Sequence, residues 1–313
     1  MLESLVVNVR PSRRALAVRG GALGDFILTL PSLKALRDAG YEVELLTRPA
    51  YGQLAKNAGQ VSGWRSLEAR EAGALMVGRA VVSRDWSQWL SGFDVVVSWL
   101  PDDDLAFRQQ ILSCGAGTFY QGDWSCTGHR PAALQLAEAV AFTGARIAEL
   151  TNLFGERELP GPDPVRRIAF HPGSGSARKN WPLESWIKVM AFLSKRDFSI
   201  AWQVITGEVE EERLPKLAAL LNQAGLRWAS VHALNLVSLC HSLRRCAGLL
   251  GHDSGISHLA AACGLPCRLL FGPTNPEVWA PLGHDVEVML APNGDLNQLG
   301  VDSVVDWLCV KPL

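Results

Sequence analysis

Near its start the chain reads Ala15-Leu-Ala-Val-Arg-Gly-Gly-Ala-Leu-Gly-Asp25 and continues directly into Phe-Ile-Leu-Thr-Leu. Residues 15–18 form a short apolar run that predicts a buried strand, and residues 25–38 have the apolar spacing of a helix. The glycines between them allow a sharp turn at the carboxyl end of the strand. A strand, a glycine-rich turn and a helix in this order predict one unit of an α/β fold with a parallel sheet.

The same alternation continues along the chain in two groups. In the first group, strands are predicted at residues 43–46 and 94–99, and helices at 104–112 and 132–145. In the second group, strands are predicted at residues 167–170, 200–205, 247–250 and 267–271, and helices at 183–195, 208–222, 234–246 and 254–263. The fold class is therefore α/β, with two Rossmann-like domains whose parallel sheets are covered by helices.

Between the two groups lies Glu158-Leu-Pro-Gly-Pro-Asp-Pro164, whose three prolines resist both helix and sheet and make a semi-rigid connector. We therefore predict an N-terminal domain over residues 1–157, a linker over 158–164 and a C-terminal domain over 165–313. The last amphipathic stretch, Val301–Val310, could pack on its own domain or return to the N-terminal one.

Composition narrows the class of protein further. The 313 residues suit two domains of about 150 residues each. Lys plus Arg number 30 and Asp plus Glu 31, so no excess of positive charge indicates a nucleic-acid binder. Residues 1–14 lack the pattern of a signal peptide, and the seven cysteines have no regular spacing. We expect a cytoplasmic protein with reduced, buried thiols.

Ligands of open α/β sheets bind at the carboxyl ends of the strands, and Asp25 lies at such a position. The aspartate could cap the adjoining helix, or it could be a general base directed into a cleft. The spacing of Gly21 and Gly24 does not match the Gly-x-Gly-x-x-Gly of a dinucleotide loop. A Rossmann dehydrogenase is therefore disfavoured.

Three loops of the second group carry further candidates. His171-Pro-Gly-Ser-Gly-Ser-Ala-Arg-Lys-Asn-Trp-Pro182 offers Ser174, Gly175, Ser176 and Lys179 either as a phosphate cradle or as a solvated turn. Thr206-Gly-Glu-Val-Glu-Glu-Glu212 offers Glu211 for ribose hydroxyls, or only favourable charge at a helix start.

In the third of these loops, Gly251-His-Asp-Ser-Gly-Ile-Ser-His258 opens a helix suited to an anion. Its two histidines and its aspartate could also be metal ligands, but nothing in the sequence completes a site. No metal is therefore expected.

Taken together, these loops resemble glycosyltransferase family 9, the heptosyltransferases. Residues 21–33 resemble the family's N-terminal signature, and residues 171–182 resemble its phosphate loop ending in Lys-x-Trp-Pro. Residues 253–262 resemble its Asp-Ser/Thr-Gly-x-x-His-x-Ala-Ala signature, and residues 271–276 its Gly-Pro-Thr-x-Pro turn. All four motifs occur in the family's order over nearly the whole chain.

The resemblance implies a GT-B fold, in which two Rossmann-like domains face each other across a cleft. It implies inverting transfer of a heptose-like sugar, without metal or cofactor, from an ADP-sugar to a glycan or glycolipid hydroxyl, as in lipopolysaccharide biosynthesis. Asp25 matches the catalytic base and Lys179 the lysine that binds the diphosphate. Gly21 and Gly24 lie in the acceptor-side loop. The donor-binding positions are Ser174, Gly175, Ser176, Glu211, Asp253, Ser254, Gly255 and His258.

Other activities remain open on the same motifs. A nucleotide-sugar epimerase or hydrolase would use the C-terminal motifs without a sugar acceptor, and a non-catalytic protein would only bind the nucleotide-sugar. Residues 53–120, where acceptor specificity is expected, contain no recognisable motif. Their acidic cluster Asp102-Asp-Asp104 is unlike a surface for a phosphorylated lipid. A lipid acceptor would place the protein at the inner face of the cytoplasmic membrane.

Overall fold

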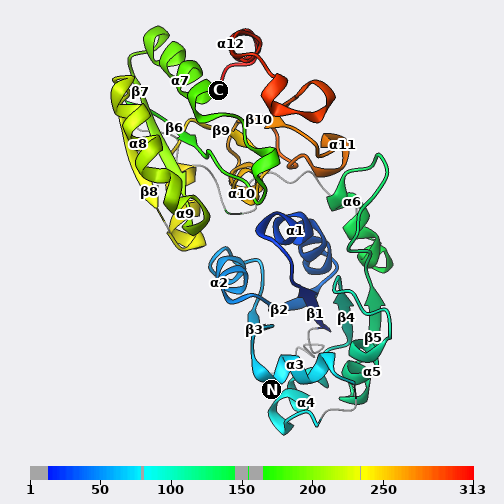
Figure 1. The fold of residues 1–313 in the computed structure, drawn as a ribbon. Helices are drawn as coiled ribbons and strands as arrows, with labels where there is room; N and C mark the ends of the chain where they lie inside the picture. The colour runs from blue at the N-terminus through cyan, green and yellow to red at the C-terminus, as the bar shows by residue number, and fades with distance from the viewer. Residues whose placement is uncertain (1–12, 79–80, 145–153, 155–164, 233) are drawn as a thin grey trace, which may run out of the picture.

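A computed structural model describes residues 13–78, 81–144, 154, 165–232 and 234–313. These residues form two parallel sheets, one in each half of the chain, with helices packed on their faces (Figure 1). The linker predicted at residues 158–164 lies outside the described residues. No helix within the described ranges is both long and apolar enough to cross a bilayer.

The N-terminal sheet has the strand order β3-β2-β1-β4-β5. Its strands are β1 (Arg13–Arg19), β2 (Tyr41–Thr47), β3 (Gly63–Ser66), β4 (Val95–Ser98) and β5 (Thr118–Gln121). Its helices are α1 (Leu23–Asp38), α2 (Pro49–Asn57), α3 (Arg70–Met76), α4 (Arg84–Leu90), α5 (Ala106–Ser113) and α6 (Ala132–Ala137). Residues 15–18 of β1 are fully buried because β1 is the central strand and helices cover both faces.

The C-terminal sheet has the order β11-β10-β9-β6-β7-β8. Its strands are β6 (Arg166–Phe170), β7 (Ile200–Thr206), β8 (Trp228–His232), β9 (Gly248–His252), β10 (Cys267–Phe271) and β11 (Val286–Leu290). Its helices are α7 (Leu183–Arg196), α8 (Leu214–Gln223), α9 (Leu236–Arg244), α10 (Gly255–Ala262), α11 (Pro276–Trp279) and α12 (Val301–Val310). Because β6 and β9 are neighbours at the centre, the loops at their carboxyl ends lie side by side.

The structure confirms every predicted strand and corrects several other expectations. The strands β3, β5, β8 and β11 were not predicted. The helix predicted from residue 132 ends at Ala137 and continues as a 3₁₀ helix to Thr143. The last helix, α12, packs on α7 through Val304 and Leu308. Six of the seven cysteines are buried as expected, but Cys309 is exposed.

The two halves meet where α1 and α10 begin, and Figure 1 shows α1 lying next to α10. A Cβ at Gly255 would lie 2.8 Å from Cβ of Leu23 and 3.2 Å from the backbone nitrogen of Gly24. A Cβ at Gly24 would lie 3.1 Å from the ring of His258. Both glycines therefore allow an approach that larger residues would prevent.

We predict opposite effects on stability for alanine at two helical glycines. Alanine favours a helix over glycine by up to about 1 kcal/mol, so Gly73→Ala in α3, with nothing within 4 Å, should raise the free energy of unfolding. Gly255→Ala should instead lower it by roughly 1–3 kcal/mol, because the added methyl group overlaps α1. Urea unfolding measures both values, and equal stabilisation by the two substitutions would contradict the close contact.

Candidate active site

A cavity of about 350 Å³ lies between the two domains, and we call it the charged cavity. Its N-terminal wall consists of Ala22, Gly24, Asp25 and Leu28. Its C-terminal wall consists of Gly175, Lys179, Asp253, Ser254, Gly255, His258, Thr274 and Trp279. The structure thus brings together the acid beyond the end of β1 and the basic loop beyond the end of β6, as the strand-end argument predicts.

Asp25 is the third residue of α1 and therefore not its N-cap. Its Oδ2 accepts a hydrogen bond of 2.9 Å from the backbone N–H of Ala22, which stabilises the helix start. Its Oδ1 lies 3.6 Å from Nη2 of Arg19, and the side chain is 32% exposed. The carboxylate thus supports the helix start while remaining open to the charged cavity.

Arg19 is the buried cation behind this carboxylate. It is 5% exposed, and its Nη1 donates a hydrogen bond of 3.2 Å to the carbonyl oxygen of Trp99. Burial lowers the pKa of Arg19, while the charge of Asp25 acts in the opposite direction. An uncompensated charge at this depth is unfavourable, so Arg19 and Asp25 stabilise one another.

Gly21 gives the turn before α1 its shape. Its φ is +85°, a left-handed conformation that favours glycine, and a Cβ there would lie 2.8 Å from Oδ2 of Asp25. The carbonyl oxygen of Gly21 accepts a hydrogen bond of 3.3 Å from the hydroxyl of Tyr51. Gly21 does not line the charged cavity, so its part is to position the loop that carries Asp25.

On the opposite wall, Nζ of Lys179 lies 2.7 Å from Oδ2 of Asp253. The lysine side chain is 32% exposed and the aspartate 9%, so the pair faces the cavity from a mostly buried position. Ser174 stabilises the loop that carries Lys179 through a hydrogen bond of 2.7 Å from its hydroxyl to Oδ1 of Asn180. Ser254 is the N-cap of α10 and accepts a hydrogen bond of 3.2 Å from the N–H of Ser257.

His258, on α10 in the C-terminal wall, is 4% exposed. Burial lowers its pKa to about 4; the carboxylates of Asp253 and Asp25 oppose this shift, and Lys179 adds to it. The imidazole is therefore neutral at neutral pH. Burial also lowers the pKa of His252, at the end of β9, to about 3.

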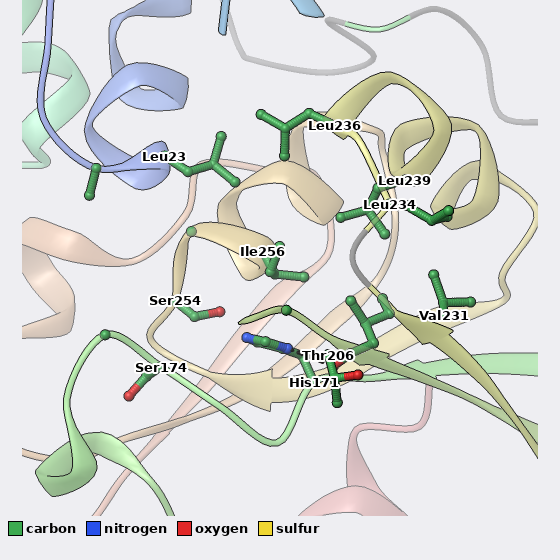
Figure 2. Close-up of a pocket in the computed structure, with 15 residues that line it drawn as sticks. Leu23, His171, Ser174, Thr206, Val231, Leu234, Leu236, Leu239, Ser254 and Ile256 are labelled. Carbon is green, nitrogen blue, oxygen red and sulfur yellow. Dashed lines mark hydrogen bonds between the residues drawn. The ribbon is translucent and has the colours of Figure 1, made fainter. Parts of the chain in front are cut away.

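A second cavity of about 330 Å³ adjoins the first, and we call it the apolar cavity (Figure 2). It lies at the carboxyl ends of β6, β7, β8 and β9. Apolar side chains from α9, α10 and their neighbours line one side in Figure 2, whereas Ser174, His171 and Thr206 lie on the other. The apolar lining, which was not predicted from the sequence, consists of Leu23, Ile205, Val231, Leu234, Leu236, Leu239 and Ile256.

Two predicted donor-binding residues lie elsewhere. Ser176 and Glu211 are exposed, and neither lines the charged or the apolar cavity. Glu211 lies on the 3₁₀ helix Glu208–Arg213, beyond Thr206 and Gly207, which do line the apolar cavity. Its binding of ribose stays a prediction.

The acidic cluster at residues 102–104 has a local structural role. The carboxylate of Asp102 accepts hydrogen bonds of 2.9 Å from the N–H groups of Phe107 and Arg108. The carboxylate of Asp104 accepts one of 3.1 Å from the N–H of Ala106. These bonds satisfy the free N–H groups at the start of α5. Nowhere in the described ranges do three His, Cys, Asp or Glu residues gather as a metal site.

Comparison with known proteins decides the family. The model of glycosyltransferase family 9 (heptosyltransferase) matches residues 140–306. The chain belongs to this family. Lipooligosaccharide heptosyltransferase 2 of Haemophilus influenzae is 27% identical over 161 residues, which cover 50% of this chain and 43% of that protein. Lipopolysaccharide heptosyltransferase 1 of Escherichia coli O18:K1:H7 is 32% identical over 134 residues, 42% of this chain and 38% of that protein.

The matched segments therefore span less than half of these relatives. Solved structures extend the likeness of fold to nearly the whole chain. E. coli heptosyltransferase WaaC with ADP superposes with a TM-score of 0.74 at 19% identity, covering 95% of this chain and 99% of that one. E. coli ADP-heptose lps heptosyltransferase II superposes with a TM-score of 0.72 at 15% identity, covering 95% of this chain and 98% of that one. The GT-B fold expected of this family 9 chain is thus confirmed.

We predict that acid weakens the fold through the buried histidines. His252 and His258 have folded-state pKa values of about 3 and about 4, against 6.5 when exposed. Between each folded-state pKa and 6.5, the unfolded chain binds more protons at these histidines than the folded chain does. Their contribution to the free energy of unfolding therefore falls as pH drops below about 6.5 and is constant above it. Each histidine should contribute roughly 1.4 kcal/mol per pH unit.

Urea unfolding between pH 7.5 and pH 5 measures this slope. His258→Gln should reduce it, whereas His284→Gln, at an exposed position outside both cavities, is the matched control. A slope that His258→Gln leaves unchanged would show that this histidine is not held neutral in the folded state.

Proposed function

We propose that this protein is an inverting glycosyltransferase that needs no metal. It would transfer a heptose-like sugar from an ADP-sugar to a hydroxyl of a glycan or glycolipid, as in lipopolysaccharide biosynthesis. The observation that carries the proposal is that Asp25 and Lys179 line one cavity from opposite domains. Membership of family 9 supports it, as do the ADP in the WaaC structure and the heptosyltransferase activity in the relatives' names.

The two cavities suggest how the donor lies. The apolar cavity suits the flat base of a nucleoside, because its walls are mainly aliphatic and it lies at the carboxyl ends of the strands. Ala22, Gly175, Ser254 and Gly255 line both cavities, so a diphosphate passing between them would lie against backbone N–H groups at the start of α10. The sugar would then occupy the charged cavity beside Asp25.

The reaction would be a single displacement. The acceptor hydroxyl gives its proton to the Asp25 carboxylate while its oxygen forms a bond to the anomeric carbon. The bond from that carbon to the diphosphate breaks, and its electron pair leaves on the phosphate oxygen. Attack from the side opposite the leaving group inverts the configuration. General-base assistance of this kind contributes roughly 10²–10⁴-fold to the rate.

Charge on the leaving diphosphate would be stabilised by Lys179 and by the N-terminus of α10. Lys179 is paired with Asp253, so the diphosphate would replace or share this partner. Each preorganised donor in such a role can contribute about 3–4 kcal/mol. Neutral His258 would donate or accept a hydrogen bond without adding charge.

Domain closure completes the proposal. We infer an acceptor-binding domain over residues 1–157 and a donor-binding domain over 165–313, joined by the proline-rich segment. Closure would exclude water and suppress hydrolysis of the donor. A glycolipid acceptor would bring the enzyme to the cytoplasmic face of a membrane.

We predict that Asp25→Asn keeps nucleotide binding and loses transfer by at least about 10²-fold. The asparagine can still accept the hydrogen bond from Ala22, so the helix start is preserved. ADP release with acceptor measures transfer, and calorimetry measures ADP affinity. Asp38→Asn, at the other end of α1, is the matched control.

Turnover of Asp25→Asn equal to that of the wild type would remove this residue from the mechanism. ADP-sugar consumption by the wild type without any acceptor would favour a hydrolase or epimerase instead.

We predict that Lys179→Ala weakens ADP binding, because the diphosphate loses its cationic partner. Adenosine carries no diphosphate, so its affinity should not change. Arg178→Ala is the control, since Arg178 is the exposed neighbour in the same turn and lines neither cavity. Calorimetry with both ligands gives the comparison, and an unchanged ADP affinity would refute the assignment of Lys179.

A further inference from the structure

His252 is a buried histidine that the proposed reaction does not use. It is the last residue of β9 and directly precedes Asp253. Its side chain is fully buried, and its Nε2 lies 2.8 Å from the backbone nitrogen of Trp181 and 3.1 Å from Nε1 of Trp186. Both partners can only donate, so Nε2 accepts two hydrogen bonds.

This geometry fixes the protonation state of the ring. An Nε2 atom that accepts hydrogen bonds carries no proton, so the single proton of the neutral ring lies on Nδ1. Burial holds the pKa of His252 at about 3, with His171 acting in the same direction. The acceptor at Nε2 is therefore present throughout the neutral range. Among the described residues, Nδ1 has no hydrogen-bond acceptor.

The two bonds connect the end of β9 to two different segments of the chain. Trp181 lies two residues beyond Lys179 and ends the loop that begins at His171. Trp186 belongs to α7, and its ring packs edge-on against Trp181 at 5.1 Å and against His252 at 5.3 Å. Through Trp181, His252 is thus hydrogen-bonded to the end of the loop that carries Lys179. The residue after His252 is Asp253, which pairs with Lys179.

A purely apolar side chain could fill the same space but could not accept from the N–H of Trp181. That N–H is buried, and a buried donor without an acceptor is unfavourable. The loop would then have to shift to satisfy it, and Lys179 would move away from Asp253. The acceptor at Nε2 therefore determines where the lysine lies relative to the start of α10.

We propose that His252 is a positioning residue, a neutral acceptor that fixes the loop of residues 171–182 against the end of β9 and so holds Lys179 in place for a diphosphate. This assignment rests on the proposed function, because it takes Lys179 as the diphosphate-binding lysine. His252 itself lines neither cavity, so it would act only through Lys179.

The test compares ADP with adenosine, since only ADP carries the diphosphate. The variant His252→Leu removes the acceptor, and His252→Gln keeps an oxygen near the place of Nε2. Calorimetry on the full chain should show ADP affinity about tenfold weaker for His252→Leu, with adenosine affinity unchanged. His252→Gln should restore most of the ADP affinity.

If His252→Leu does not fold, His252→Asn replaces it in the comparison. The asparagine side chain remains polar, but its oxygen does not reach the position that Nε2 occupies in the wild type. Trp186→Phe is the matched control; it removes the indole donor but leaves the bond to Trp181, and should keep ADP affinity within about twofold of the wild type.

Equal losses for ADP and adenosine would overturn the assignment, since they would indicate general damage to the domain. An unchanged ADP affinity in His252→Leu, or in His252→Asn where that variant replaces it, would also overturn it. A wild-type protein that binds ADP no more tightly than adenosine would instead refute the proposed function, and this assignment with it.

Discussion

The site depends on the close approach of two helix starts. α1 and α10 begin in different domains, and Gly255 lets them approach closely, because a Cβ there would lie 2.8 Å from Cβ of Leu23 and 3.2 Å from the backbone nitrogen of Gly24. Each helix start offers unsatisfied N–H groups, and each is preceded by a loop at the end of a central strand. The contact therefore places the Asp25 loop of one domain beside the Asp253 loop of the other. Were the helices a few ångströms farther apart, one cavity would become two separate surfaces.

Each charge in this cavity has a partner of opposite charge within the protein. Arg19 lies behind Asp25 at 3.6 Å, and Lys179 is bonded to Asp253 at 2.7 Å. Unpaired charges in so enclosed a place would be strongly unfavourable, and pairing removes most of that penalty. Binding of an anionic ligand is then an exchange of partners for Lys179 and not the neutralisation of an isolated charge. Burial keeps His258 and His252 neutral, so neither adds a competing positive charge.

Much of this arrangement can be predicted from the sequence because it rests on short apolar strands and the loops at their carboxyl ends. The strand at residues 15–18 is central and fully buried, so its apolar run is continuous and the position of Asp25 beyond its end is predictable. Lys179 and Asp253 were found by the same reasoning. β3, β5, β8 and β11 were missed because all four lie at sheet edges, where half-buried residues interrupt such runs.

Other features depend on packing that a single sequence does not reveal. The apolar cavity uses Leu236 and Leu239, which read as ordinary residues of an amphipathic helix until α9 is seen beside the strand ends. His252 was considered as a metal ligand, but its partners turned out to be Trp181 and Trp186, which are distant in sequence. For Glu211 the structure shows an exposed residue outside both cavities, so the ribose contact suggested by an acid after a strand stays a prediction.

A crystal structure of the protein soaked or co-crystallised with ADP would show directly whether the two domains form one site. We expect the diphosphate to lie within hydrogen-bond distance of Nζ of Lys179 and the start of α10, with the Asp25 carboxylate facing it across the same cavity. Density for the diphosphate at any other place, or an Asp25 side chain that no longer faces Lys179 in the complex, would contradict it.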